Sequence, residues 1–206
     1  MTNITSLLSD DVRELNVDTE SAQSLVTLLS IGDDSVIDTP QFVNSGFQPE
    51  LQLEGKWCWA AVGSMISTYY WNGVGREWKQ CDIASENTRL PAGTNCCVNP
   101  MDEICDQAYL LSETLKIVER LHKFENHGFD HKSSSRIFDE VVNVGNLVPI
   151  RIQREDGSGH FYIICGYWEE EDVFALWDPA GEWELESAES FESDFGGQWT
   201  HTYFLA

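Results

Sequence analysis

Apolar and polar positions alternate in the last third of the chain and predict strands there. Short apolar runs occupy residues 148–153, 160–168, 173–179 and 198–205, and they contain the β-branched and aromatic side chains that favour strands. Only the polar residues 169–172 separate the second run from the third. A connection of this length favours an antiparallel hairpin.

A helical pattern comes earlier in the chain. Ala61, Met65 and Tyr69 recur at helical spacing and predict a helix over residues 58–70. Glycines and prolines then interrupt residues 72–100, which we expect to form a long loop region.

Two further helices are expected before the strands begin. One covers residues 102–115, and the other covers residues 134–142, with Ser134 or Ser135 as its cap and Gly145 at its end. Because helices come first and strands follow, the predicted fold class is α+β.

The first 46 residues differ from the rest of the chain. They contain no Trp, Tyr, Cys or His, and acidic residues are scattered through them. We interpret residues 1–46 as an acidic N-terminal extension that serves as a propeptide, a leader, a docking segment or a mobile tail. Residues 47–206 then form the folded domain.

The composition excludes several classes of protein. A hydrophobic fraction of 42% with eight Trp excludes global disorder. Twelve basic against 35 acidic residues give a net charge of −23, so we expect no nucleic-acid partner and no binding to anionic membranes. We also expect a monomer.

The N-terminus does not resemble an ordinary secretory signal, since it lacks a basic start and an uninterrupted apolar stretch. The protein is therefore expected to stay in the cytoplasm, to be exported by a route other than the general secretory one, or to have lost a signal already.

Cys58 stands at the start of the predicted helix, where a nucleophile would be well placed. The positive end of the helix dipole and the unpaired N–H groups there favour a thiolate; the alternative is a buried core cysteine. Gln52 lies six positions upstream. Its amide and the N–H of Cys58 could together stabilise an oxyanion.

His160 opens the second predicted strand after the flexible run 156–159, and Asp178 ends the third. Reflecting the chain about the 169–172 turn pairs Asp178 with about residue 163. The carboxylate could then orient the imidazole. Taken alone, His160 is an exposed turn residue, and Asp178 begins an Asx turn before a proline.

Together these residues resemble the papain-like cysteine peptidases. Gln52 and Cys58 have the Gln-x5-Cys spacing, Trp59 follows the nucleophile directly, His160 begins a Gly-His-Phe strand, and Asp178 begins an Asp-Pro pair 18 residues after His160. Many relatives have Asn where this chain has Asp178. The motif set resembles the bacterial branch, which contains papain-fold effector proteases and relatives of the bacteriocin-leader-processing peptidases.

The resemblance covers about residues 50–205 and implies a papain-like fold and a thiol hydrolase that acts on a protein or peptide without a cofactor. In it Cys58 would be the nucleophile, His160 the general base and acid, Asp178 the orienting residue and Gln52 the oxyanion donor. Two alternatives stay open. The same residues could transfer an acyl group to an amine, or the chain could be a catalytically silent binding module.

The other cysteines have different expected roles. The spacing of the four in the middle of the chain does not match that of zinc sites, and we expect two disulfides if the protein works in an oxidising compartment. Three connectivities are open. These disulfide candidates are Cys81, Cys96, Cys97 and Cys105, while Cys165 is expected in the core.

Three histidines recur at spacings of five and four residues, at His122, His127 and His131. This spacing suggests a metal, but no carboxylate or cysteine pattern completes the ligand set, so we expect no metal site. His201 on the last predicted strand is expected to be structural.

Overall fold

The computed structural model describes residues 42–73, 75–87, 89–126, 134–187, 190 and 197–205, with the backbone alone for 121–126 and 134. Most of the predicted extension, residues 1–41, lies outside this range. The described residues belong to one compact unit, Thr39–Ala206. No helix in the described part of the chain has the length and apolar character to cross a membrane.

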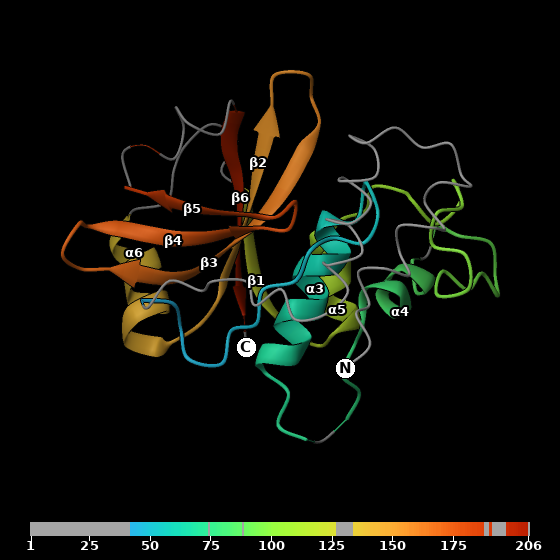
Figure 1. Ribbon diagram of the computed structural model, residues 1–206, viewed down its shortest axis with the longest axis horizontal. Coiled ribbons are helices and arrows are strands. Elements are labelled where there is room, and N and C mark those ends of the chain that lie inside the picture. Colours follow the sequence, from blue (N-terminus) through green and yellow to red (C-terminus); the bar gives the residue numbers. More distant parts are fainter. Residues whose placement is uncertain are drawn as a thin grey trace, which may run out of the picture. The chain divides into compact units, whose positions relative to one another are not determined.

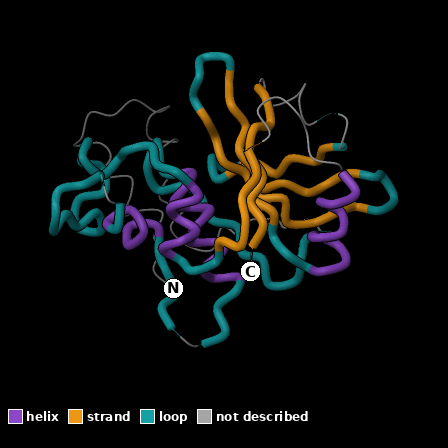
Figure 2. Tube along the Cα trace, turned by 180° about the vertical axis from the view of Figure 1, so that it is seen from behind, coloured by secondary structure: helices purple, strands orange, loops and turns teal. Residues whose placement is uncertain are grey.

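The described residues of this unit form five helical segments and one six-stranded antiparallel sheet, in the strand order β1-β6-β2-β3-β4-β5 (Figures 1 and 2). The helical segments are α3 (Cys58–Tyr69), α4 (Gln80–Ser85), α5 (Leu111–Ile117), α6 (Ser134–Phe138) and the π-helical turn η1 (Asp139–Val144). The strands are β1 (Leu121–Asn126), β2 (Val148–Arg154), β3 (Gly159–Trp168), β4 (Val173–Asp178), β5 (Glu182–Glu186) and β6 (Gly197–Leu205).

The α+β class is confirmed, and so are the four predicted strands. Apolar side chains at every second position of β2, such as Val148, Ile150 and Ile152, pack on Ile137 and Val141 of α6 and η1. These side chains lie on one face of the sheet, because successive side chains on a strand point to opposite faces, and the helical segments bury that face. Figure 1 shows α3 on the other side of β3, with α4 and α5 beside it.

The helix predicted over residues 58–70 is confirmed as α3, and the one predicted over residues 134–142 is confirmed as α6 and η1. Gly145 ends η1 with a left-handed φ of 79°, a conformation that a residue without a Cβ adopts without strain.

The helix predicted over residues 102–115 is wrong in its first half. Asp102 accepts hydrogen bonds from the backbone N–H groups of Ile104 and Cys105, so it forms a tight turn there, and α5 begins only at Leu111. Three further elements were not predicted: α4 inside the expected loop region, β1 in the connection that follows α5, and β5 after β4.

A β-bulge interrupts the pairing of β3 with β4. Ile164 lies opposite Leu176, whereas Gly166 lies opposite Ala175, so Cys165 is an extra residue on β3. The carbonyl of Cys165 accepts a 2.8 Å hydrogen bond from the N–H of Asn44.

Residues 42–46, which the sequence analysis placed in the extension, lie against this bulge. Val43 pairs with Gly166, and the Phe42 ring stacks on Trp168 at 5.3 Å. A Cβ at Gly166 would collide with the backbone of Phe42 and Val43. A separable N-terminal extension would therefore have to end before Phe42.

Candidate active site

Cys58 is the first residue of α3, as predicted, and it is buried, with 7% of its surface exposed. Trp57 at the N-cap makes no side-chain hydrogen bond to the helix, and the first turn contains no acidic residue. The first N–H groups of a helix have no partner within it. The positive end of α3 and its N–H groups are therefore directed at the thiol.

The residues on either side of Cys58 are fixed by a segment far along the chain. The indole N–H of Trp57 donates to the carbonyl of Cys105 at 2.9 Å, and that of Trp59 donates to the carbonyl of Gln107 at 3.0 Å. The backbone N–H of Lys56 donates to Asp106 at 2.8 Å. Residues 105–107 thus hold the loop that presents the thiol.

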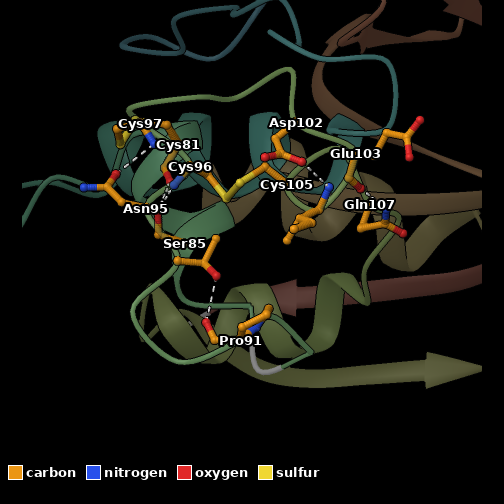
Figure 3. Close-up of a disulfide and its surroundings, with 12 residues drawn as sticks. Cys81, Ser85, Pro91, Asn95, Cys96, Cys97, Asp102, Glu103, Cys105 and Gln107 are labelled. Carbon is orange, nitrogen blue, oxygen red and sulfur yellow. Dashed lines mark hydrogen bonds between the residues drawn. A yellow bond between two sulfur atoms is a disulfide. The ribbon is translucent and has the colours of Figure 1, made fainter.

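Two disulfides lie near this segment, and one of them holds Cys105 directly. Cys96 is joined to Cys105, and Cys81 to Cys97 (Figure 3). The N–H of Cys96 also donates to Ser85 Oγ at the end of α4 at 2.9 Å. The structure thus pairs all four disulfide candidates, in one of the three connectivities that the sequence left open.

His160 and Asp178 meet through their side chains. His160 Nε2 lies 2.5 Å from Asp178 Oδ1, and both residues are buried. Asp178 Oδ1 also accepts the backbone N–H of Ala180 at 2.6 Å, which fixes the carboxylate. The second ring nitrogen, Nδ1, is left for Cys58, whose side chain is hydrogen-bonded to His160.

The bulge explains why these two side chains meet. Ile163 pairs with Trp177, so Asp178 lies across from Tyr162, two positions from His160 and on the same face. The rings of His160 and Tyr162 are 4.9 Å apart. Without the extra residue, Asp178 would lie across from residue 163, as the sequence analysis expected, and would face the other side.

The surroundings of His160 favour its charged form. Burial lowers its pKa, but hydrogen bonds to Asp178 and to Cys58, together with the charges of both, outweigh burial and raise the pKa to about 9. A protonated imidazole at neutral pH is what a thiolate–imidazolium pair requires.

Gln52 is not directed freely at the thiol. Its Nε2 donates to the carbonyls of Glu54 at 2.9 Å and Gly55 at 3.0 Å, while its buried Oε1 has no hydrogen-bond partner. The backbone N–H of Gln52 donates to the carbonyl of Pro179 at 2.7 Å. In this state the side-chain amide stabilises the loop before Cys58, and the backbone N–H of Gln52 ties that loop to the residue after β4.

Cys58 and His160 open on a cleft of about 870 Å³ between the helices and the sheet. Its lining residues are Gly55, Lys56, Cys58, Trp59, Arg89, Ala108, Tyr109, Leu110, Ser112, Arg151, Gln153, Arg154, Gly157, Ser158, Gly159, His160, Phe161, His201 and Tyr203. His201, expected to be structural, is therefore part of the cleft wall.

Cys58 is the one cysteine thiol with access to this cleft. All six cysteines lie within the described residues; four are in disulfides, and only Cys58 and Cys165 are free. Cys165 is fully buried, and burial raises the pKa of its thiol well above the usual value. Cys165 therefore has the core position that was predicted for it.

Within the described residues, one group of side chains has the spacing of metal ligands. Cys81, Asp82 and Cys97 cluster closely, but the two sulfur atoms are bonded to each other, and metal binding needs thiolates. His127, His131 and the side chain of His122 lie outside the described residues.

Sequence reasoning missed the residues that support the nucleophile. Trp57 and Trp59 could have been noted as indoles on both sides of Cys58, but their acceptors lie 48 positions away. Nothing local in the sequence identifies residues 105–107 as those acceptors.

The antiparallel sheet, with α3 packed against β3 and Cys58 at the start of that helix, fits the papain-like fold, and a family match makes the chain a papain-like cysteine peptidase. A family model described as the Peptidase_C39 like family matches residues 44–206, so the chain belongs to that family. The predicted fold and enzyme class are both confirmed.

Among solved structures, the chain is similar to the peptidase domain of Streptococcus ComA, a bifunctional ABC transporter involved in a quorum-sensing pathway. The two are 15% identical with a TM-score of 0.49, over 78% of this chain and 98% of that one. A comparison with curated proteins gives no match.

Proposed function

We propose that the chain hydrolyses peptide bonds with Cys58 as nucleophile, His160 as general base and acid, and Asp178 as the residue that orients His160. The observation that carries this proposal is the buried contact between His160 Nε2 and Asp178 Oδ1 at 2.5 Å. It turns the other ring nitrogen toward the one thiol of the cleft.

In the first half of the reaction, His160 Nδ1 holds the proton of the Cys58 thiol, and the thiolate adds to the scissile carbonyl carbon. The carbonyl π electrons move to the oxygen and form an oxyanion. When the carbonyl re-forms, the C–N bond breaks and His160 gives its proton to the leaving amine. The product at this point is a thioester on Cys58.

In the second half, His160 takes a proton from water, and the hydroxide adds to the thioester carbonyl. The C–S bond then breaks, the acid is released, and the proton returns to the Cys58–His160 pair. Asp178 holds the imidazole orientation throughout and stabilises its positive charge.

Two donors are proposed for the oxyanion. The backbone N–H of Cys58 is one of the unpaired groups at the start of α3. Gln52 Nε2 is the other, and it would release Glu54 or Gly55 when substrate enters. Its present partners are main-chain oxygens of a turn, and water can replace Nε2 as the donor to these oxygens.

The test uses a peptide with a thiol-reactive warhead and the native protein. One molecule of probe is expected to bind per chain, at Cys58, as measured by intact mass and peptide mapping. Cys58→Ala should abolish both labelling and cleavage of a mixed peptide library. Cys165→Ala, which removes the other free thiol, is the matched control and should retain both.

Failure of the native protein to react with the probe or to cleave any peptide would contradict the proposal. The same digests, run with and without an added primary amine, measure the split between hydrolysis and acyl transfer. Amide products at the expense of acid products would indicate a transferase.

A further inference from the structure

The charge of the cleft is opposite to that of the chain as a whole. Acidic residues outnumber basic ones by 35 to 12 in the sequence, yet the charged side chains that line the cleft are Lys56, Arg89, Arg151 and Arg154. Among the described residues, no Asp or Glu lines it. A third of the chain's lysines and arginines thus gather around one site.

These cations come from three separate parts of the fold. Lys56 lies in the loop just before the nucleophile, Arg89 follows α4, and Arg151 and Arg154 belong to β2. Because they converge from both walls, a bound segment would meet positive charge on either side. Walls of low dielectric constant concentrate such a field.

None of the four forms an ion pair within the described part of the chain, although the Arg154 side chain is hydrogen-bonded to Tyr162. The ion pairs there join other residues, namely Arg76 to Asp82, Lys116 to Glu113 and His160 to Asp178. The Arg89 guanidinium lies 5.4 Å from the centre of the Tyr109 ring.

Arg151 is the best placed of the four. Its guanidinium donates to neutral oxygens, Thr200 Oγ1 at 3.0 Å and Gln153 Oε1 at 3.3 Å. The guanidinium lies so close to Gly159 that a Cβ on residue 159 would collide with the guanidinium. Gly159 directly precedes His160, so this half-buried cation lies next to the reacting groups.

Two carboxylates near these cations accept hydrogen bonds from backbone N–H groups. Asp106 accepts the backbone N–H of Lys56, and Asp156 accepts the N–H of Ser158 at 2.8 Å. Asp156 is fully exposed, and hydrogen bonds from Ser158 lower the pKa of its carboxyl more than the charge of Arg154 does.

We infer that the cleft selects acidic peptide segments, with Asp or Glu side chains bound by Arg151, Arg154, Arg89 and Lys56 close to the scissile bond. An arginine fork matches a carboxylate with two parallel hydrogen bonds. An extended peptide advances roughly 3.3–3.6 Å per residue. The selected acids should therefore lie within about three residues of the cleaved bond.

This inference rests on the proposed function for its catalytic meaning, but its test does not require turnover. The full chain carrying Cys58→Ala is mixed with fluorescein-labelled octapeptide pools, in which each position in turn is fixed as Glu, Gln or Lys. Binding is measured by anisotropy at low and at high salt.

Pools with Glu at the preferred positions should bind about five- to tenfold more tightly than the matching Gln pools, with Lys pools weakest. High salt should reduce the preference, because ions screen exposed charges. Arg154→Gln, which removes a charge at an exposed position, should bring the Glu-to-Gln ratio toward one, and Arg151→Gln should do so more strongly.

Lys116→Gln removes the same charge from the exposed surface of α5, outside the cleft, and should leave the ratio unchanged. Equal binding of the Glu, Gln and Lys pools, or no binding of any pool, would overturn the inference. Acid-selective binding without cleavage by the native protein would instead overturn the proposed function and leave this inference standing.

Discussion

Asp178 contacts His160 through one carboxylate oxygen, Oδ1, which also accepts the N–H of Ala180. The carboxylate in contact with the imidazole is thus itself held by the backbone of the turn that follows β4. The pair is rigid because each member is buried and each has a second contact: Asp178 with Ala180, and His160 with Cys58.

The Asp178 pair predicts a pH dependence. The pKa of His160 is about 9 in the folded protein, against an ordinary value of about 6.5. Because the folded-state value is the higher one, the stability that the imidazolium contributes is fully present below about pH 6.5 and is lost as the pH rises through about 9. The basic limb of kcat/KM against pH should fall in the same window.

Asp178→Asn should move that limb toward lower pH, because the negative charge that raises the pKa of His160 is gone. Much of the activity at neutral pH should remain, since an amide oxygen can still accept from Nε2, whereas Asp178→Ala should cost more. If the basic limb of kcat/KM stayed at the same pH in Asp178→Asn, the carboxylate of Asp178 would not be what raises the pKa of His160.

Cys58 and His160 should show the largest losses of activity. His160→Ala should lower kcat roughly as far as Cys58→Ala, because groups that act as a unit give losses that do not add. Cys58→Ser should be nearly as inactive, since a hydroxyl is far harder to ionise than a thiol. Single-turnover cleavage by each variant, together with the double variant, measures this; additive losses would speak against a unit.

Gln52→Ala separates two roles of the same amide. If Gln52 donates to the oxyanion, kcat should fall roughly 10²–10³-fold. If it only holds the loop, the loss of two contacts to Glu54 and Gly55 should lower the free energy of unfolding by about 1–2 kcal/mol with a smaller change in kcat. Thermal unfolding and kcat measured on the same preparation distinguish the two results.

The disulfide between Cys96 and Cys105 should matter for activity as well as stability. Replacing both cysteines by Ala should cost about 2–4 kcal/mol of stability. It should also lower kcat/KM, because residues 105–107 hold the loop around Cys58. The Cys81→Ala/Cys97→Ala pair is the matched control, with a similar stability loss and a smaller change in kcat/KM.

Thiol counts under denaturing, non-reducing conditions check the starting point for these variants. The native chain should show two thiols, those of Cys58 and Cys165. A count of six would show that the disulfides are absent from the preparation. Equal kcat/KM in the two double variants would argue against a special role for Cys105.

Residues 1–41 are predicted to be dispensable for the domain. Their composition, free of Trp, Tyr and Cys, offers little that could be buried. Deleting 1–41, which spares Phe42 and Val43, should leave the melting temperature within about a degree or two. A larger loss would show that the segment packs on the domain.

The sequence predicted the elements whose signals are local. Cys58 at a helix start and the strands on either side of the 169–172 turn follow from periodicity and turn chemistry within short windows. The meeting of His160 with Asp178 was also expected from the hairpin, but the register that lets them meet was not, because the bulge at Cys165 sets it.

The features that were missed depend on distant parts of the chain. The turn at Asp102 replaces a helix because a disulfide and side-chain hydrogen bonds hold it, and β1 forms because β6 pairs with it, with Leu121 opposite Leu205. Such tertiary contacts override the local helix or strand propensity of a segment. The two carbonyl contacts of Gln52 could not be foreseen from spacing, because they depend on how the loop folds.

The extra residue at Cys165 has a consequence for how this peptidase can change in evolution. Side chains alternate between faces along a strand, so an insertion or deletion of one residue in β3 between His160 and the bulge would turn His160 away from Asp178. Changes of length in the 169–172 turn leave that relation intact. The tip of the hairpin can therefore change in length while the strand pairing persists, whereas an unmatched insertion or deletion in β3 between His160 and the bulge would separate the two side chains.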